Sequence, residues 1–318
     1  MELIAKVTQK CDMACSFCAA SGCSEHVGLL QPEEIAEAAK KLDTDSIILA
    51  GGEVLTLPPA YYEKLLSLTP STARIELVSN LKDFSLHPSK WEKLFKNPRI
   101  SVCTSFNYGK GRRWDKDTVY DEAMFKDTIR KFKDHIGYIP MFIAVIDKDN
   151  VDTWRKHIEL AKSLGTICRL NNALKIGRSG EYFPRSRMFQ IWTQVVKEGL
   201  DSYELNAANR GTGKCPCNGN LLCKNTIRVM KRNTAGEIRY YRCDDDSNKE
   251  CNGMTQLDNP PPTPLAPQVV LKPQCYSCEL FRLCNGCESN ALQIEDKDEY
   301  CRDMLSIKKE LLEQGWLH

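Results

Sequence analysis

Residues 1 to about 200 alternate apolar runs of strand length with amphipathic runs of helix length, six times in succession. This alternation is typical of a parallel β/α fold, because a crossover helix must separate each pair of parallel strands. We expect strands centred on Ile4–Val7, Ser46–Leu49, Ile75–Val78, Ile100–Thr104, Met141–Ile146 and Ile167–Leu170. We expect helices centred on Pro32–Lys41, Ala60–Leu68, Ser89–Phe95, Tyr120–His135, Val151–Leu164 and Arg185–Glu198. Six such units predict an α/β fold, a partial (β/α)6 barrel whose chemistry gathers at the carboxyl ends of the strands.

Cysteine usage indicates metal binding rather than disulfides. The 318-residue chain holds 16 cysteines and no secretory signal, so a disulfide framework is not expected. Clustered thiols in a reducing cytoplasm point to metal sites. The formal net charge is +2 and no apolar run is long enough to cross a bilayer. The overall balance therefore predicts neither a membrane partner nor a nucleic-acid partner.

Three cysteines, Cys11, Cys15 and Cys18, follow the first predicted strand. Three thiolates on one loop can hold three irons of a 4Fe–4S cluster and leave the fourth iron open for a substrate or cofactor. The alternative is a zinc site, for which Cys23 or His26 would supply the fourth ligand. In either case the loop lies at the carboxyl end of a predicted strand, where the catalytic residues of β/α barrels gather.

A second motif, Gly51-Gly52-Glu53, directly follows the second predicted strand. Glycines let the backbone approach a ligand closely, and the acid can accept hydrogen bonds from an ammonium group. Taken alone, this motif is weak evidence, because Gly-Gly-Glu at a tight turn usually marks only the turn.

The two motifs together resemble the signature of the radical SAM superfamily, in which Phe17 is the aromatic residue before the last cysteine. The resemblance implies that the open iron binds S-adenosylmethionine (AdoMet) and that the glycine motif contacts its methionyl amine. Leu81 stands where the family often has a glycine, and Gly177-Arg178 resembles a pair common in the same subgroup. The cofactor contacts that the resemblance implies are Phe17, Gly51, Gly52, Glu53, Ser79, Asn80, Ser105 and Val145.

Ten of the sixteen cysteines lie between Cys215 and Cys301. We therefore divide the chain into a barrel, residues 1–200, and a small cysteine-rich domain, residues 201–318. The spacing of the latter resembles the SPASM domain of radical SAM enzymes that modify peptides and proteins, which implies two auxiliary 4Fe–4S clusters. The implied ligands are Cys217, Cys223, Cys243 and Cys287 for one cluster, and Cys275, Cys278, Cys284 and Cys301 for the other. Cys215 or Cys251 could replace a ligand, and structural zinc is the alternative for the whole segment.

The resemblance implies a radical enzyme that needs a reductant such as flavodoxin or ferredoxin. AdoMet would be cleaved to a 5′-deoxyadenosyl radical that abstracts hydrogen from a substrate C–H bond. Our first interpretation is oxidation, cross-linking or epimerisation of a peptide or protein side chain. The second is modification of a nucleotide or DNA base, and the third is a non-catalytic zinc or electron-transfer module.

Two features favour the nucleotide interpretation. The chain begins at its first barrel strand, so we expect no separate domain that grips a leader peptide. The basic runs Lys110–Arg113 and Lys175–Arg187 follow the fourth and sixth strands, where they could face nucleic acid or a phosphorylated substrate. Solvated loops are the alternative for both runs.

Cys103 is a candidate catalytic residue. By strand alternation it shares the inward face with Ser105, where its thiol could donate a hydrogen atom to a substrate radical. Packing is the alternative role for a buried strand cysteine. Asp244–Asp246 offer a possible base near an auxiliary cluster.

Overall fold

The computed structural model describes residues 2–18, 29–173, 183, 185–203, 227–233 and 235–241, with the single positions 302, 306, 309 and 313. Within these residues, eight strands form one sheet in the order β6-β5-β4-β3-β2-β1-β7-β8. The strands are β1 (Glu2–Thr8), β2 (Ser46–Gly51), β3 (Arg74–Val78), β4 (Ile100–Ser105), β5 (Phe142–Ile146), β6 (Cys168–Asn172), β7 (Ile227–Arg232) and β8 (Ile238–Tyr241). The helices are α1 (Pro32–Lys41), α2 (Pro59–Leu68), α3 (Lys82–Leu86), α4 (Pro88–Phe95), α5 (Glu122–Ile136), α6 (Trp154–Leu164) and α7 (Arg185–Lys197), with short 3-10 turns η1 (Val54–Thr56) and η2 (Val151–Thr153).

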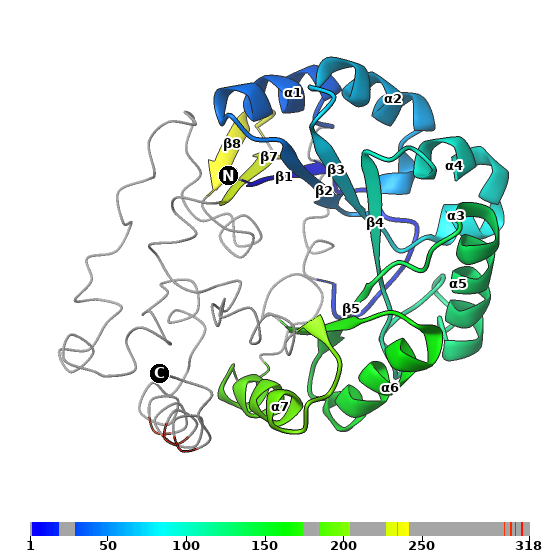
Figure 1. The fold of residues 1–318 in the computed structure, drawn as a ribbon, viewed down its shortest axis with the longest axis vertical. Coiled ribbons are helices and arrows are strands. Elements are labelled where there is room, and N and C mark those ends of the chain that lie inside the picture. Colours follow the sequence, from blue (N-terminus) through cyan, green and yellow to red (C-terminus); the bar gives the residue numbers. More distant parts are fainter. Residues whose placement is uncertain are drawn as a thin grey trace.

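Strands β1 to β6 pair in parallel, each with its neighbour in sequence. Strand β7 pairs in parallel with β1, and β8 is antiparallel to β7. Strands β6 and β8 are the edges, so the sheet does not close. The helices lie along the outer side of the curved sheet (Figure 1). This α/β fold with an open, mostly parallel sheet confirms the predicted partial barrel.

Alternation along each strand separates the two faces of the sheet. On β1 the side chains of Leu3, Ala5 and Val7 are fully buried, whereas Ile4 and Lys6 are partly exposed. The buried set packs with residues of α1, α2 and α4 in one core, and a second core joins β5 and β6 to helices α5, α6 and α7. The helices therefore cover the outer face and leave the inner face to line the barrel.

Three elements were not expected from the sequence. Helix α3 spans only five residues, too few to show a helical period. Strands β7 and β8 lie beyond residue 200, and three of the six residues of β7, Arg228, Lys231 and Arg232, are charged, which obscures its strand character. Because β7 pairs with β1, residues past 200 extend the barrel sheet; a domain boundary near residue 200 stays a prediction. Across the described residues, no helix has the length and apolar character needed to span a bilayer.

The chain turns from β3 into α3 through Leu81, whose φ is +60°. The left-handed region costs a non-glycine residue about 1 kcal/mol or more. Two interactions hold this residue there: its side chain is fully buried in the core, and its N–H donates to the Ser79 hydroxyl at 2.9 Å. The turn directs the residues on either side, Asn80 and Lys82, toward the loop that follows β1.

Candidate active site

The three N-terminal cysteines occupy the loop that follows β1, at the carboxyl edge of the sheet. The Cys15 side chain is buried, Cys18 is half-buried, and Cys11 reaches solvent. Two backbone bonds fix the loop to the segment after β4: Ala14 N–H donates to the Arg113 carbonyl at 3.2 Å, and Ser16 N–H to the Gly111 carbonyl at 2.8 Å. We call residues 11–18 the cysteine loop and residues 111–114 its partner segment.

The cysteine loop carries three thiols but does not form a completed metal site in the described part of the chain. Part of the Cys11 side chain reaches solvent, but desolvation by the surrounding residues, followed by the charges of Glu53, Asp12 and Cys18, raises the pKa of its thiol to about 12. Among the described residues, no three His, Cys, Asp or Glu side chains are gathered as a finished metal site. Metal ligands are generally drawn together and deprotonated only as the metal binds. The loop therefore fits the cluster in its donor set.

Gly51 and Gly52 dock the end of β2 onto the segment that leads into Cys11. Gly52 N–H donates to the Thr8 carbonyl and Glu53 N–H to the Lys10 carbonyl, both at 2.7 Å. A Cβ at Gly52 would lie 2.2 Å from the Lys10 carbonyl oxygen. A Cβ at Gly51 would lie equally close, at 2.2 Å, to the Thr8 carbonyl oxygen. The glycines thus allow the end of β2 to approach another segment of the protein's own backbone closely.

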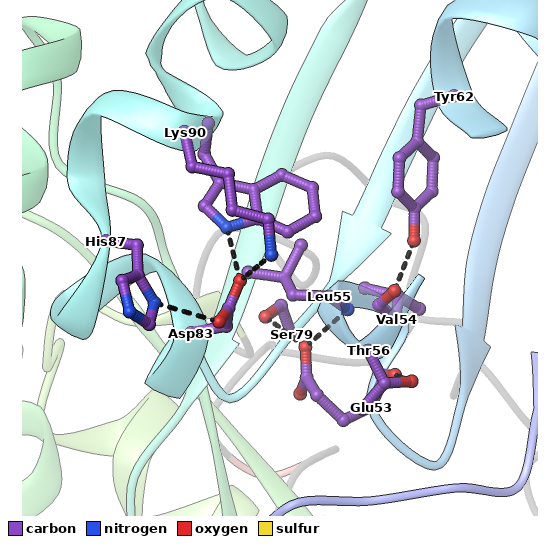
Figure 2. Close-up of polar contacts among 10 residues, drawn as sticks. Glu53, Val54, Leu55, Thr56, Tyr62, Ser79, Asp83, His87 and Lys90 are labelled. Atoms are coloured by element: carbon purple, nitrogen blue, oxygen red, sulfur yellow. Dashed lines mark hydrogen bonds and ion pairs between the residues drawn. The ribbon is translucent and has the colours of Figure 1, made fainter. Parts of the chain in front are cut away.

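Glu53 connects this turn to the end of β3. Its side chain is 1% exposed, and its carboxylate accepts hydrogen bonds from Leu55 N–H at 2.9 Å and from the Ser79 hydroxyl at 2.6 Å (Figure 2). The second oxygen accepts from Asn80 N–H at 2.6 Å. Burial raises the pKa of Glu53 to about 7, and the three hydrogen bonds oppose that rise. The carboxylate holds Ser79 and Asn80 in place.

Asn80 carries this network to the cysteine loop. Its side-chain amide donates to the Asp12 carboxylate at 2.8 Å, and the same nitrogen lies 3.9 Å from the Cys11 sulfur. Sequence reasoning selected Asn80 but missed Asp12, although Asp12 directly follows a predicted ligand. Whether Ser79, Asn80 and Glu53 also contact AdoMet stays a prediction.

The other predicted cofactor contacts lie at the ends of β4 and β5 or beside the partner segment. Ser105 is half-buried at the end of β4, and Val145 lies half-buried on β5. The Val145 carbonyl accepts from the side-chain amides of Asn150, at 2.8 Å, and Asn107. The Phe17 ring packs on Gly111, where an added Cβ would lie 3.1 Å from a ring carbon. All of these residues surround the carboxyl edge of the sheet.

Cys103 is deep in the barrel rather than at its edge. Its side chain is 2% exposed, and burial raises the pKa of its thiol to about 12, with Glu76 adding to the rise and Arg169 opposing it. The influence of Glu76 and Arg169 is consistent with the predicted inward orientation, because both residues are half-buried and lie on the inner face of the sheet, on β3 and β6. The group is a neutral thiol at physiological pH.

Buried polar atoms without a hydrogen-bond partner occur at the same carboxyl edge. Buried polar groups are normally satisfied, so such atoms indicate a missing partner such as a ligand. Within the described part of the chain these include the side-chain oxygens of Gln9, Asn107 and Asn172 and the Nε and Nη2 atoms of Arg112. They lie at the end of β6 or in the segments that follow β1 and β4. This edge is suited to a polar ligand that offers both donors and acceptors.

Arg112 changes the interpretation of the first basic run. Its side chain is only 4% exposed, and its guanidinium lies 5.5 Å from the centre of the Tyr120 ring. Lys110 is exposed, whereas the Arg113 carbonyl is bonded to the cysteine loop. The run is therefore largely an internal brace for that loop. Most of the second run, Lys175–Arg187, lies outside the described residues.

Several predicted residues also lie outside the described part of the chain. They are Cys23, His26, Gly177, Arg178, Cys215, Cys217, Cys223, Cys243, Asp244, Asp245, Asp246, Cys251, Cys275, Cys278, Cys284, Cys287 and Cys301. The assignments of auxiliary-cluster ligands stay predictions.

Comparison with known families decides the class of this site. The model of the radical SAM superfamily matches residues 5–161, which include the second half of β1, the cysteine loop and the Gly-Gly-Glu turn. Residues 5–161 form a radical SAM domain. The match covers the cysteine loop, and the superfamily implies an enzyme that uses AdoMet and an iron–sulfur cluster. The assignment of the three cysteines as ligands of that cluster stays a prediction.

Two solved structures have a fold similar to that of this chain. One is described as hexahistidine-tagged anSMEcpe with bound AdoMet; it is 15% identical, covers 98% of this chain and 97% of its own, and gives a TM-score of 0.64. Another, native anSMEcpe with bound AdoMet and Cp18Cys peptide, is 15% identical, covers 98% of this chain and 96% of its own, and gives a TM-score of 0.66. At this identity the likeness establishes a shared fold. No curated protein sequence matches the chain.

A buried histidine supports the start of the loop that leads to the partner segment. His157 of α6 is fully buried; its Nδ1 donates to the Thr153 carbonyl at 2.9 Å and its Nε2 accepts from Tyr108 N–H at 3.1 Å. Burial lowers the pKa of His157 to about 4. The contact with Tyr108 requires the neutral imidazole, because a protonated Nε2 cannot accept a hydrogen bond.

The free energy of unfolding should therefore fall as the pH drops from about 6.5 to about 4, because the unfolded chain takes up this proton first. The full loss attributable to His157 is about 3 kcal/mol. We expect His157→Gln to be less stable at pH 7 and to lack most of this pH dependence in urea titrations. His87→Gln, at an exposed histidine, is the control. Equal pH slopes for wild type and His157→Gln would contradict the assignment.

Proposed function

We propose that the chain reductively cleaves AdoMet at a 4Fe–4S cluster held by Cys11, Cys15 and Cys18, and that the resulting 5′-deoxyadenosyl radical abstracts hydrogen from a peptide or protein side chain. The observation that carries the substrate class is a fold shared over nearly the whole chain with a structure that holds both AdoMet and a peptide. That structure is of a SPASM-domain radical SAM enzyme. The chain's cysteine spacings beyond residue 200 support the same subgroup.

The residues at the carboxyl edge have chemistry suited to AdoMet. When bound, a three-cysteine cluster supplies one electron and an open iron for the amino and carboxylate groups of the cofactor. We assign the unpaired donors of Arg112 to a carboxylate, since a guanidinium pairs with carboxylates through two hydrogen bonds. The backbone at Gly51 and Gly52 brings Glu53 beside the cysteine loop. The residues of the protein would bind AdoMet, orient it and exclude water from it.

We further propose two auxiliary 4Fe–4S clusters, with the ligand sets expected from the sequence. Eight thiolates are the number that two fully ligated clusters require. Such clusters have no open iron, so they would accept the electron that a substrate radical releases on oxidation, or relay electrons inward. A cytoplasmic reductant such as flavodoxin or ferredoxin would supply the cleavage electron.

Nucleotide or DNA-base modification is the second candidate, and one of its supports has weakened. Arg112, the centre of the first basic run, is buried against Tyr120 rather than available to a phosphate backbone. An epimerase is a variant of the peptide proposal in which Cys103 returns a hydrogen atom. The Cys103 thiol is protonated, as that role requires, and the substrate would have to reach into the barrel.

Deuterium transfer can identify the substrate class directly. Reduced enzyme and AdoMet would be incubated with a peptide pool, and separately with a nucleic-acid digest, both from cells grown in heavy water. We expect mass spectrometry to find deuterium in 5′-deoxyadenosine only with the peptide pool, because the radical takes its hydrogen from the substrate. Label only from the nucleic-acid digest would overturn the peptide proposal and support the second candidate. An unlabelled peptide pool is the matched control.

A further inference from the structure

Lys82 makes contacts that neither the fold nor the superfamily assignment explains. Its ammonium group donates to the Asp12 carbonyl at 2.7 Å, within the cysteine loop, and also to the Trp114 carbonyl in the partner segment. The same nitrogen lies 5.0 Å from the centre of the Trp114 ring. One side chain from the start of α3 therefore joins the two segments on which the loop depends.

The surroundings of Lys82 fix its direction. Its backbone N–H donates to the Asn80 side-chain oxygen at 2.8 Å, and Asn80 bonds to the Asp12 carboxylate. The left-handed conformation of Leu81 bends the chain between Asn80 and Lys82, so that both side chains reach the cysteine loop. Asp12 is thus held twice, by its carboxylate and by its carbonyl, and it is the residue next to Cys11.

We propose that Lys82 is a positioning residue for the cluster-binding loop, joining the Asp12 carbonyl to the Trp114 carbonyl and placing a positive charge beside the cluster. A bond to the Asp12 carbonyl restricts the backbone that carries Cys11. A nearby cation also favours the reduced, more negative state of an iron–sulfur cluster, because net charge is one determinant of its potential. The second effect rests on the proposed cluster, whereas the first belongs to the chain itself.

Three variants separate these effects. Lys82→Met keeps the approximate length of the side chain but removes its hydrogen-bond donors and its charge. Lys82→Arg keeps the donors and the charge. Lys90→Met is the matched control, because Lys90 also lies over a tryptophan ring, at 4.9 Å from Trp91, and bonds to a carboxylate, that of Asp83 (Figure 2). Circular dichroism and urea unfolding would first show that each variant is folded.

The first measurement uses the cluster-free chain. The amides of Ala14 and Ser16 bond to the partner segment, so their hydrogen exchange reports on local opening of the cysteine loop. This exchange should be at least about tenfold faster in Lys82→Met than in wild type. A tenfold change corresponds to a loss of roughly 1.4 kcal/mol in the free energy of local opening. Lys82→Arg should restore most of the protection, and Lys90→Met should match wild type. Unchanged exchange in Lys82→Met, or the same increase in Lys90→Met, would overturn the proposal.

The second measurement uses the iron-loaded chain. The midpoint potential of the cluster whose spectrum responds to AdoMet should become more negative in Lys82→Met and stay near wild type in Lys82→Arg and Lys90→Met. A potential unaffected by Lys82→Met would overturn the charge effect. If no cluster responds to AdoMet even in wild type, the proposed function fails, and the exchange result still decides whether Lys82 positions the loop.

Discussion

Gly52→Ala is expected to abolish cluster binding by the cysteine loop while leaving most of the barrel folded. The added Cβ would lie 2.2 Å from the Lys10 carbonyl oxygen and 2.6 Å from the Gln9 carbonyl carbon, both backbone atoms that cannot rotate away. Relief requires the segment between β1 and Cys11 to move, which costs about 3 kcal/mol or more. We expect anaerobically reconstituted Gly52→Ala to form less than about a tenth as much 5′-deoxyadenosine as wild type, since about 1.4 kcal/mol corresponds to a factor of ten.

Gly137→Ala is the matched control for this substitution. Gly137 ends α5 with φ +96°, and an added Cβ there would meet no atom within 4 Å. Its replacement should cost only the strain of a left-handed alanine, about 1 kcal/mol, without affecting the cleavage of AdoMet. If Gly52→Ala retains the AdoMet-dependent cluster and its activity, the glycine turn does not set the position of the cysteine loop.

The barrel could be predicted from the sequence because each of its first six strands is an apolar run followed by an amphipathic helix. The boundaries of α1 are those expected, since Pro32, Glu33 and Glu34 mark its start unambiguously. Helix α3 could not be found, because it is too short for a periodic pattern and begins after a leucine in a left-handed conformation. Strand β7 could not be found, because Arg228, Lys231 and Arg232 make it look like an exposed segment. Their burial depends on neighbouring chain segments and is not visible in the local sequence.

The candidate site could be predicted only where its signal is local in sequence. Cysteine spacing and the Gly-Gly-Glu turn were recognisable, although the glycines serve contacts with the chain itself. Asp12, Lys82 and Arg112 were missed as site residues. Their roles arise from tertiary contacts, such as the bond between Lys82 and the Asp12 carbonyl, which are 70 residues apart in the chain. Such pairings follow from the order of strands in the barrel, and no spacing rule reveals them.

The combined substitution of Cys11, Cys15 and Cys18 by Ala should have the largest effect. Removing all three thiolates leaves the loop without the ligands for the cluster that delivers the electron, so cleavage of AdoMet should fall to the level of the enzyme-free control. The barrel should stay folded, because the three residues lie in a loop outside its helices and strands, and of their side chains only that of Cys15 is buried within a core. A chain with Cys275 and Cys278 changed to Ala is the matched control, since it loses two thiols but keeps the cysteine loop.

The most direct test is therefore to quantify 5′-deoxyadenosine after anaerobic incubation of the reconstituted, reduced chain with AdoMet. We predict clear formation by wild type, none above background by the triple variant, and at least partial retention by the Cys275 and Cys278 variant. No 5′-deoxyadenosine from iron-loaded wild type, or equal amounts from wild type and the triple variant, would contradict the assignment of Cys11, Cys15 and Cys18 as the ligands of a cluster that cleaves AdoMet.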